Sequence, residues 1–183
     1  MKLLRTIRLD PSDTFVFEQA AEPGEWAVTG TFIFTDDDPS KLEGKARAAF
    51  RSGLLGVASF GWSTLAVVAE ATAAERDAAV EALAGHLREL LGAPSLEAAR
   101  AAAREEVEFA ESLCAHPAGT LIAVQRTVED GDARERFRTL APRGDRAPAD
   151  QHWGPVFRFV ESDAEDEPAE PVDLGDLARR GRE

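Results

Sequence analysis

The stretch TAAERDAAVEALAGHLRELLGAPSLEAARAAAREEVEFAESLCA, from Thr72 to Ala115, decides how the rest of the chain can be arranged. Thr72 and Glu75 have the spacing of a capping box, so a helix is expected to begin there. Gly92-Ala93-Pro94 ends it, and Ser95 is placed to cap a second helix that runs to about Ala115. Because the connection is short, the two helices are predicted to lie antiparallel as an αα-hairpin.

Each of these helices carries one apolar stripe at helical spacing. In the first helix the stripe consists of Val80, Leu83, Leu87, Leu90 and Leu91. In the second it consists of Leu96, Ala99, Ala103, Val107, Ala110 and Cys114. The small residues of the second stripe permit close approach to another helix or to a sheet.

Segments before the hairpin alternate like strands. They are 2–9, 14–18, 26–34, 54–60 and 63–71, the last two separated by Gly61 as a hairpin or bulge. The alternation in 26–34 is the clearest strand pattern in the chain. Asp38 followed by Pro39 predicts a helix over 38–52, with Gly53 as a left-handed cap.

More strands are expected after the hairpin. The predicted segments are 120–128, 134–140 and 156–160, with a tight turn at Asp130-Gly131 and a loop over 144–153. Residues 161–183 hold nine acidic residues and three arginines without an apolar period, so this tail is expected to be disordered.

Strands joined mainly by turns, with helices inserted as blocks, indicate the α+β class. We predict a mainly antiparallel sheet with three helices, two of them forming the αα-hairpin, packed on one face. Residues 1–160 are expected to form a single domain, followed by the acidic tail.

Composition excludes several classes of function. The 183 residues carry a net charge of −13, which disfavours binding to nucleic acid or to an anionic membrane. The longest purely apolar run, 65–69, is too short to span a bilayer, and no signal-peptide pattern follows the first residues. The single cysteine, Cys114, excludes an internal disulfide and fits a reducing cytoplasm.

Familiar catalytic and metal-binding patterns are incomplete. Gly61-Trp62-Ser63-Thr64-Leu65 starts like a nucleophile elbow, but it lacks the final glycine and precedes a strand, so a structural turn is preferred. Cys114 and His116 are too few for a zinc site, and Cys114 falls on an apolar stripe. Glu105, Glu108 and Glu111 have no Glu-x-x-His partners and indicate a solvated helix face. No catalytic residue, metal or cofactor is expected.

The candidate ligand- or partner-binding residues are four arginines. Arg134, Arg136 and Arg138 alternate along one strand and should project from one face, with Arg126 on the neighbouring strand. Such a row could bind a carboxylate, a phosphate or an acidic protein strand. The alternative is that Glu129, Asp132, Glu161 or the acidic tail neutralises it on a solvent-facing sheet.

Segments 1–8, 21–28, 60–65 and 114–121 together resemble a bacterial protein family of unknown function, over the whole folded part. The resemblance implies an accessory role at most, associated with maturation of a molybdenum enzyme such as formate dehydrogenase, or with a lipoate-ligase-like protein. It implies no catalytic residue.

Two hypotheses follow. The first is a non-catalytic cytoplasmic accessory protein that binds another protein, or forms a homodimer, through the arginines or the acidic tail. The alternative is a small-anion-binding protein or a small enzyme, whose pocket lies between sheet and helices and is lined by Trp62, Ser63 and the arginines.

Overall fold

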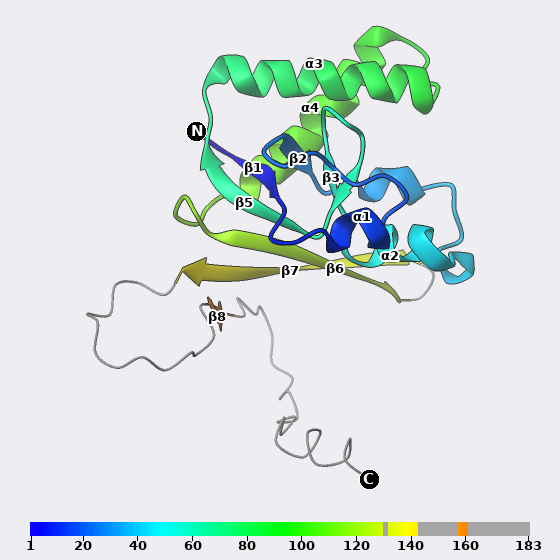
Figure 1. Cartoon of the computed structure of the whole chain (residues 1–183). Coiled ribbons are helices and arrows are strands. Elements are labelled where there is room, and N and C mark those ends of the chain that lie inside the picture. Colours follow the sequence, from blue (N-terminus) through cyan, green and yellow to red (C-terminus); the bar gives the residue numbers. More distant parts are fainter. Residues whose placement is uncertain (130–131, 143–156, 161–183) are drawn as a thin grey trace, which may run out of the picture.

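The structure, a computed structural model, describes residues 1–129, 132–142 and 157–160. These residues form one antiparallel sheet of eight strands in the order β4-β3-β2-β1-β5-β6-β7-β8 (Figure 1). The strands are β1 (Lys2–Ile7), β2 (Trp26–Val28), β3 (Leu54–Gly56), β4 (Trp62–Ser63), β5 (Leu65–Glu70), β6 (Leu121–Glu129), β7 (Asp132–Pro142) and β8 (Phe157–Val160). The predicted α+β class with a mainly antiparallel sheet is confirmed.

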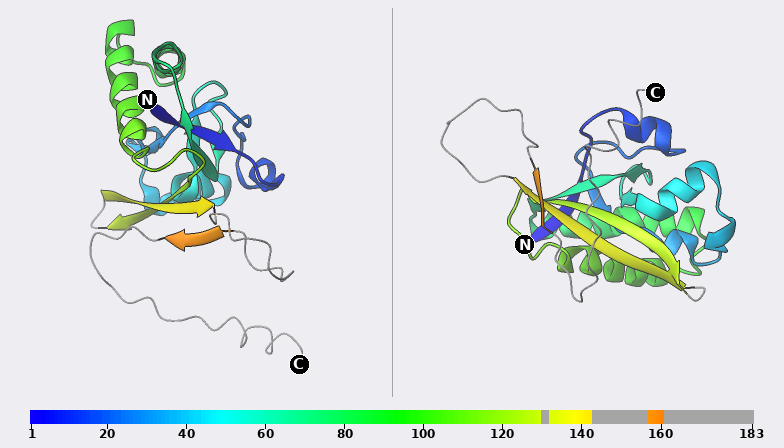
Figure 2. Two further views of the ribbon diagram at one scale, coloured as in Figure 1. Left: turned by 90° about the vertical axis from the view of Figure 1, so that its left-hand side faces the viewer. Right: turned by 90° about the horizontal axis from the view of Figure 1, so that it is seen from below.

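The predicted αα-hairpin is formed by α3 (Ala73–Leu90) and α4 (Leu96–Ser112), which pack against each other. Figure 2 shows the pair on one side of the sheet, and α4 contacts β1 and β2. The Thr72 hydroxyl accepts a hydrogen bond from the Glu75 backbone N–H, and the Glu75 carboxylate accepts one from the Thr72 backbone N–H. The predicted capping box is therefore confirmed. Ser95 likewise accepts from the Ala98 N–H.

Most of both stripes is buried in a single apolar core. Its helical members are Ala79, Val80, Leu83, Ala84, Leu87, Ala99, Ala103, Val107, Ala110 and Cys114. Leu90 and Leu91, which the stripe of the first helix included, are exposed at the end of α3. The helix leaves the core before its last turn, because the loop at Gly92 turns the chain into α4.

The strand predicted over 26–34 is wrong beyond Val28. Gly30 adopts a left-handed backbone with φ of 79°, and Thr31–Phe34 follow as a 3-10 helix, η1. The period-two pattern persists in the sequence, but a left-handed residue cannot continue an extended strand.

Two other local predictions also need correction. The strand predicted over 14–18 is wrong, because the chain there forms the short helix α1 (Ser12–Val16). At the start of this helix, the Ser12 N–H donates a hydrogen bond to the Asp10 carboxylate. The helix predicted over 38–52 is divided into a 3-10 turn, η2 (Pro39–Lys41), and α2 (Gly44–Ser52). Gly53 is extended at φ −84°, so it does not supply the left-handed cap.

The remaining strands fall close to their predicted positions. β3 and β4 form a hairpin whose connection contains Gly61, so the strand predicted over 54–60 ends at Gly56. β6 and β7 pair over nine residues in a long hairpin. Helix α2 packs against β6. The turn at Asp130-Gly131, the loop over 144–153 and the tail over 161–183 lie outside the described residues. None of the described helices combines the length and apolar composition that crossing a bilayer requires.

Candidate functional site

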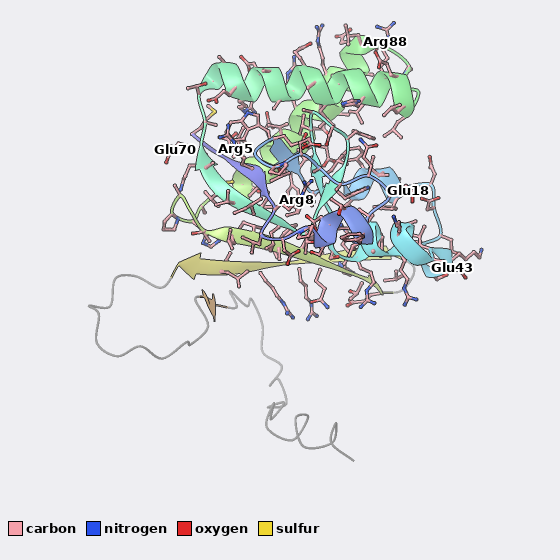
Figure 3. The ribbon with its side chains drawn as sticks, in the orientation of Figure 1. Arg5, Arg8, Glu18, Glu43, Glu70 and Arg88 are labelled. Atoms are coloured by element: carbon pink, nitrogen blue, oxygen red, sulfur yellow. The ribbon has the colours of Figure 1, made fainter. Side chains whose placement is uncertain are left out.

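Three of the four predicted arginines form a row on one face of β7. Arg134, Arg136 and Arg138 lie opposite Thr127, Gln125 and Ala123 of β6, and all three arginines are exposed. In Figure 3 side chains project from β7 on the side away from the α3–α4 hairpin. The Arg134 Nε lies 4.0 Å from a carboxylate oxygen of Glu129, a solvent-exposed contact that contributes little to stability.

Arg126 is separated from this row because it lies on the other face of the hairpin. Its cross-strand partner is Glu135, and directly paired residues share a face of the sheet. The Arg126 side chain is 1% exposed. The sequence predicts the four arginines as one set, and the structure brings only three of them together.

The guanidinium of Arg126 joins segments that are distant in the sequence. Its Nε donates to Thr31 Oγ1 and to Glu135 Oε1, both at 2.8 Å. Its Nη1 donates to the carbonyls of Phe50 at 3.0 Å and Gly53 at 2.8 Å, and its Nη2 donates to the Thr29 carbonyl. This arginine therefore ties β6 to the ends of β2 and α2, which is a structural role.

A groove opens on the face that carries the row. It measures about 640 Å³, which is within the usual range of small-molecule sites. Its lining residues are Leu9, Ala48, Arg51, Ser52, Leu65, Leu121, Ala123, Val124, Gln125, Arg138 and Leu140. They come from α2, from β5 to β7 and from the segment after β1, so the groove lies between a helix and the sheet.

Two guanidinium groups lie among the mainly apolar walls of this groove. Arg138 belongs to the exposed row on β7, and Arg51 lies in the last turn of α2. Arg51 was not predicted as a binding residue, because nothing in the sequence places α2 beside β7. Trp62 and Ser63, which were predicted to line the pocket, are not among the lining residues.

Other arginines near the sheet bind elsewhere. Arg5 lies in β1 and Arg8 directly follows that strand; both are labelled in Figure 3. The Arg5 guanidinium lies 4.3 Å from the centre of the Trp26 ring, and the Arg8 Nη2 donates to the Ala21 carbonyl at 2.6 Å. These interactions hold them apart from the row.

Ser63 is the last residue of β4, and its hydroxyl has a structural role at the connection to β5. Its hydroxyl donates to the Leu65 carbonyl at 2.8 Å, and the Asp13 carboxylate nearby accepts from the Thr64 hydroxyl at 2.5 Å. Trp62 stacks on Phe34 with ring centres 5.4 Å apart. The tryptophan therefore packs against another aromatic side chain of the fold.

The cysteine and the two described histidines, His86 and His116, are dispersed. Cys114 is buried, its Sγ contacts the Ala110 carbonyl at 3.4 Å, and burial raises the pKa of the thiol to about 11. His86 packs on Phe60, while His116 offers its backbone carbonyl to Lys2. Across residues 1–129, 132–142 and 157–160, no group of three or more His, Cys, Asp or Glu is placed to hold a metal ion. His152 lies outside these ranges.

Two acidic residues of α4, Glu108 and Glu111, pair with the neighbouring helix. Arg76 of α3 lies 3.1 Å from Glu108 and 3.2 Å from Glu111. Arg100 of α4 in turn makes a two-pronged contact with Glu81 of α3. Glu105, Glu108 and Glu111 therefore lie on the outer surface of the helical hairpin, in agreement with the predicted solvated face.

Glu106 of α4 is half-buried near the Arg126–Glu135 pair. Burial, and after it the charges of Glu135 and Glu105, raise the pKa of its carboxyl to about 7, while the charge of Arg126 opposes the shift. The carboxyl is thus poised to take up a proton near neutral pH.

Replacing Glu106 by Gln is expected to remove a pH-dependent part of the stability. Between a pKa near 4.5 in the unfolded chain and about 7 in the folded one, only the folded state holds this proton. The free energy of unfolding should therefore fall as pH rises from 5 to 8, by about 1–2 kcal/mol after allowance for partial exposure. Urea unfolding of the natural chain and of Glu106→Gln at both pH values measures this difference.

The matched control is Glu89→Gln, at an exposed position of α3. This control should keep the pH dependence of the natural chain. An unchanged dependence in Glu106→Gln would show that the carboxyl is not the group that takes up the proton.

Comparison with known proteins gives one finding. The model of a family of unknown function, DUF6505, matches residues 1–150, which include all four segments on which the resemblance was based. The comparisons with curated proteins and with solved structures each found no match.

Proposed function

This chain belongs to the DUF6505 family of unknown function, and we propose that it is a non-catalytic protein that binds an organic anion with an apolar body. The observation that carries the proposal is the groove of about 640 Å³, in which Arg51 and Arg138 stand among apolar walls. A ligand of this kind would place its carboxylate or phosphate at the two guanidinium groups and its apolar body against the apolar side chains of the groove.

The chemistry of the groove supports this ligand class. Leucine and alanine side chains supply most of the walls, so burial of an apolar body contributes affinity. Guanidinium groups bind planar anions through paired hydrogen bonds, and the low polarity of the walls strengthens such bonds. These two arginines also give the groove a local positive charge in a chain whose net charge is −13.

The polar lining supports binding more than catalysis. Besides the two arginines it consists of Ser52 and Gln125. Among the described residues, the lining includes no histidine, cysteine or carboxylate, which are the usual general acids and bases. We extend the proposal to a cytoplasmic location, which the single, buried Cys114 supports. We do not extend it to maturation of a metalloenzyme, since none of these contacts bears on that role.

A protein partner is the second candidate. The observation that favours it is the exposed row of Arg134, Arg136 and Arg138, which lies along a stretch of β7 that has no outer strand partner among the described residues, since an acidic strand could pair there. This candidate is the accessory role predicted from the sequence.

Decanoate is a suitable probe for the groove, because it joins one carboxylate to an apolar chain. Titration calorimetry should show binding to the natural chain and at least tenfold weaker binding to the Arg51→Glu/Arg138→Glu variant. The reason is that each lost charge-assisted hydrogen bond is worth about 1.5–3 kcal/mol.

The matched control is Arg47→Glu/Arg134→Glu. It makes the same charge changes four residues earlier on α2 and on β7, at exposed positions that do not line the groove. The control should bind decanoate as the natural chain does. Equal weakening in both variants would show that net charge, and not the two groove arginines, controls binding. The absence of any binding to the natural chain would refute the proposed ligand class.

A further inference from the structure

Strands β5 and β6 part beside the groove. Their pairing ends where Ala66 lies opposite Ile122. Leu65 of β5 and Val124 of β6 come just beyond this last pair, and both line the groove. The groove therefore opens where the sheet divides between two neighbouring strands.

The residue that would continue the pairing is bonded elsewhere. In the same register Thr64, the residue before β5, would lie opposite Val124. Instead, the Thr64 backbone N–H donates to the Asp13 carboxylate at 3.2 Å, and the Thr64 hydroxyl donates to the same carboxylate at 2.5 Å. Asp13 is buried in α1, so this end of β5 is bound to α1. Val124 is left without a partner on that side among the described residues.

Two backbone groups of Val124 point into this split. Along an antiparallel strand, successive residues direct their N–H and C=O alternately to the neighbour on each side. The Thr120 carbonyl accepts from the Val68 N–H of β5 at 2.8 Å, so Val124, four residues later along the unbroken β6–β7 register, also faces β5. Within the part of the chain that the structure describes, no hydrogen bond reaches the Val124 N–H or C=O from this side. A ligand that displaces water there must supply one acceptor and one donor.

Arg51 provides a cation in the same groove. It lies in the last turn of α2, the helix that packs against β6. The residue is exposed, and it makes no hydrogen bond or ion pair with any residue that the structure describes. The groove thus combines a guanidinium, the donor and acceptor of Val124, and walls of leucine and alanine.

We propose that the ligand of the groove is an N-acylated amino acid, whose amide N–H lies next to its carboxylate. The inference rests on the proposed function and narrows its ligand class. In an extended conformation the N–H and the carboxylate of such a molecule point to one side, as the N–H and C=O of a strand residue do. The N–H donates to the Val124 carbonyl, one carboxylate oxygen accepts from the Val124 N–H, and Arg51 binds the other oxygen. The acyl chain lies against the apolar walls.

The C-terminal residue of a peptide carries the same two groups, but the walls of the groove favour the acyl molecule. Each further peptide group would have to leave water, and leucine side chains offer it no hydrogen bond. An acyl chain loses no such bonds and gains from apolar burial. Acetyl-Leu-Leu-Gly should therefore bind at least tenfold more weakly than N-octanoylglycine. Tighter binding of the peptide would overturn the assignment of an acyl chain.

Titration calorimetry of the full chain with N-octanoylglycine and O-octanoylglycolate tests the hydrogen bond to the Val124 carbonyl. The two molecules have the same charge and length, but an ester oxygen replaces the N–H in the second. N-octanoylglycine should bind at least tenfold more tightly, because the ester cannot donate and sets its oxygen against the carbonyl. Equal or tighter binding of the ester, which is the more apolar molecule, would overturn the proposal.

The same titrations separate this proposal from the proposed function. If decanoate and the ester bind and the amide brings no advantage, only the N-acyl assignment fails. If none of the three molecules binds, the anion-binding function fails with it. As a second readout, saturation with N-octanoylglycine should move the amide proton resonance of Val124 downfield, since its N–H gains a charged acceptor. An unchanged resonance would also overturn the proposal.

Discussion

The Arg126→Met chain is expected to unfold with about 3–5 kcal/mol less free energy than the natural chain. Methionine can fill much of the space, but it donates no hydrogen bond. The carbonyls of Thr29, Phe50 and Gly53 would lose their donor, and Glu135 would keep its charge without its closest cation. Because the site is 1% exposed at Arg126, water cannot replace these bonds without opening the fold.

Chemical denaturation monitored by tryptophan fluorescence measures this loss. Arg136→Met is the matched control, since Arg136 is an exposed arginine on the adjacent strand β7 and should change stability by less than about 0.5 kcal/mol. A loss below about 1 kcal/mol in Arg126→Met would contradict the structural role assigned to this residue.

Gly30→Ala is expected to cost about 2–4 kcal/mol. The backbone there has φ of 79°, which a side chain disfavours, and an added Cβ would lie 2.7 Å from the Leu55 Cβ and 2.8 Å from the Trp62 ring. Neither neighbour can move freely, because Leu55 is buried and Trp62 is stacked on Phe34. The two costs, one of conformation and one of overpacking, therefore add.

Gly24→Ala separates these two costs. Gly24 has φ of 88°, but an added Cβ would meet no atom within 4 Å. Only the conformational part remains, so we expect a loss of about 1 kcal/mol. Thermal and urea unfolding of both variants should give clearly different losses, and equal losses would mean that the close approach of Trp62 to Gly30 is not as described.

The helical hairpin and the long β6–β7 hairpin could be predicted because their signals are local. The capping box at Thr72 and the short connection before Ser95 act within a few residues. The strand over 26–34 could not be bounded in this way. Its alternation does not indicate that Gly30 is left-handed, and Trp62, which packs closely against Gly30, comes 32 residues later in the sequence.

In the candidate site, too, the features set by local sequence could be predicted and those set by tertiary contacts could not. The alternation of Arg134, Arg136 and Arg138 correctly predicted that they share a face, because alternation is intrinsic to a strand. The face on which Arg126 lies depends on the register between β6 and β7, which one turn residue more or less would change. Likewise, the groove depends on how α2 lies beside the sheet, a tertiary contact that no local pattern of Arg51 indicates.

Mapping of decanoate on the ¹⁵N-labelled full chain by chemical-shift perturbation tests the proposed binding site most directly. We expect the largest saturable changes at the backbone amides of Ala48, Ser52, Ala123, Gln125 and Leu140, which surround Arg51 and Arg138. Changes centred on α3 and α4, or small changes spread evenly over the surface without saturation, would contradict the assignment of the groove as the binding site.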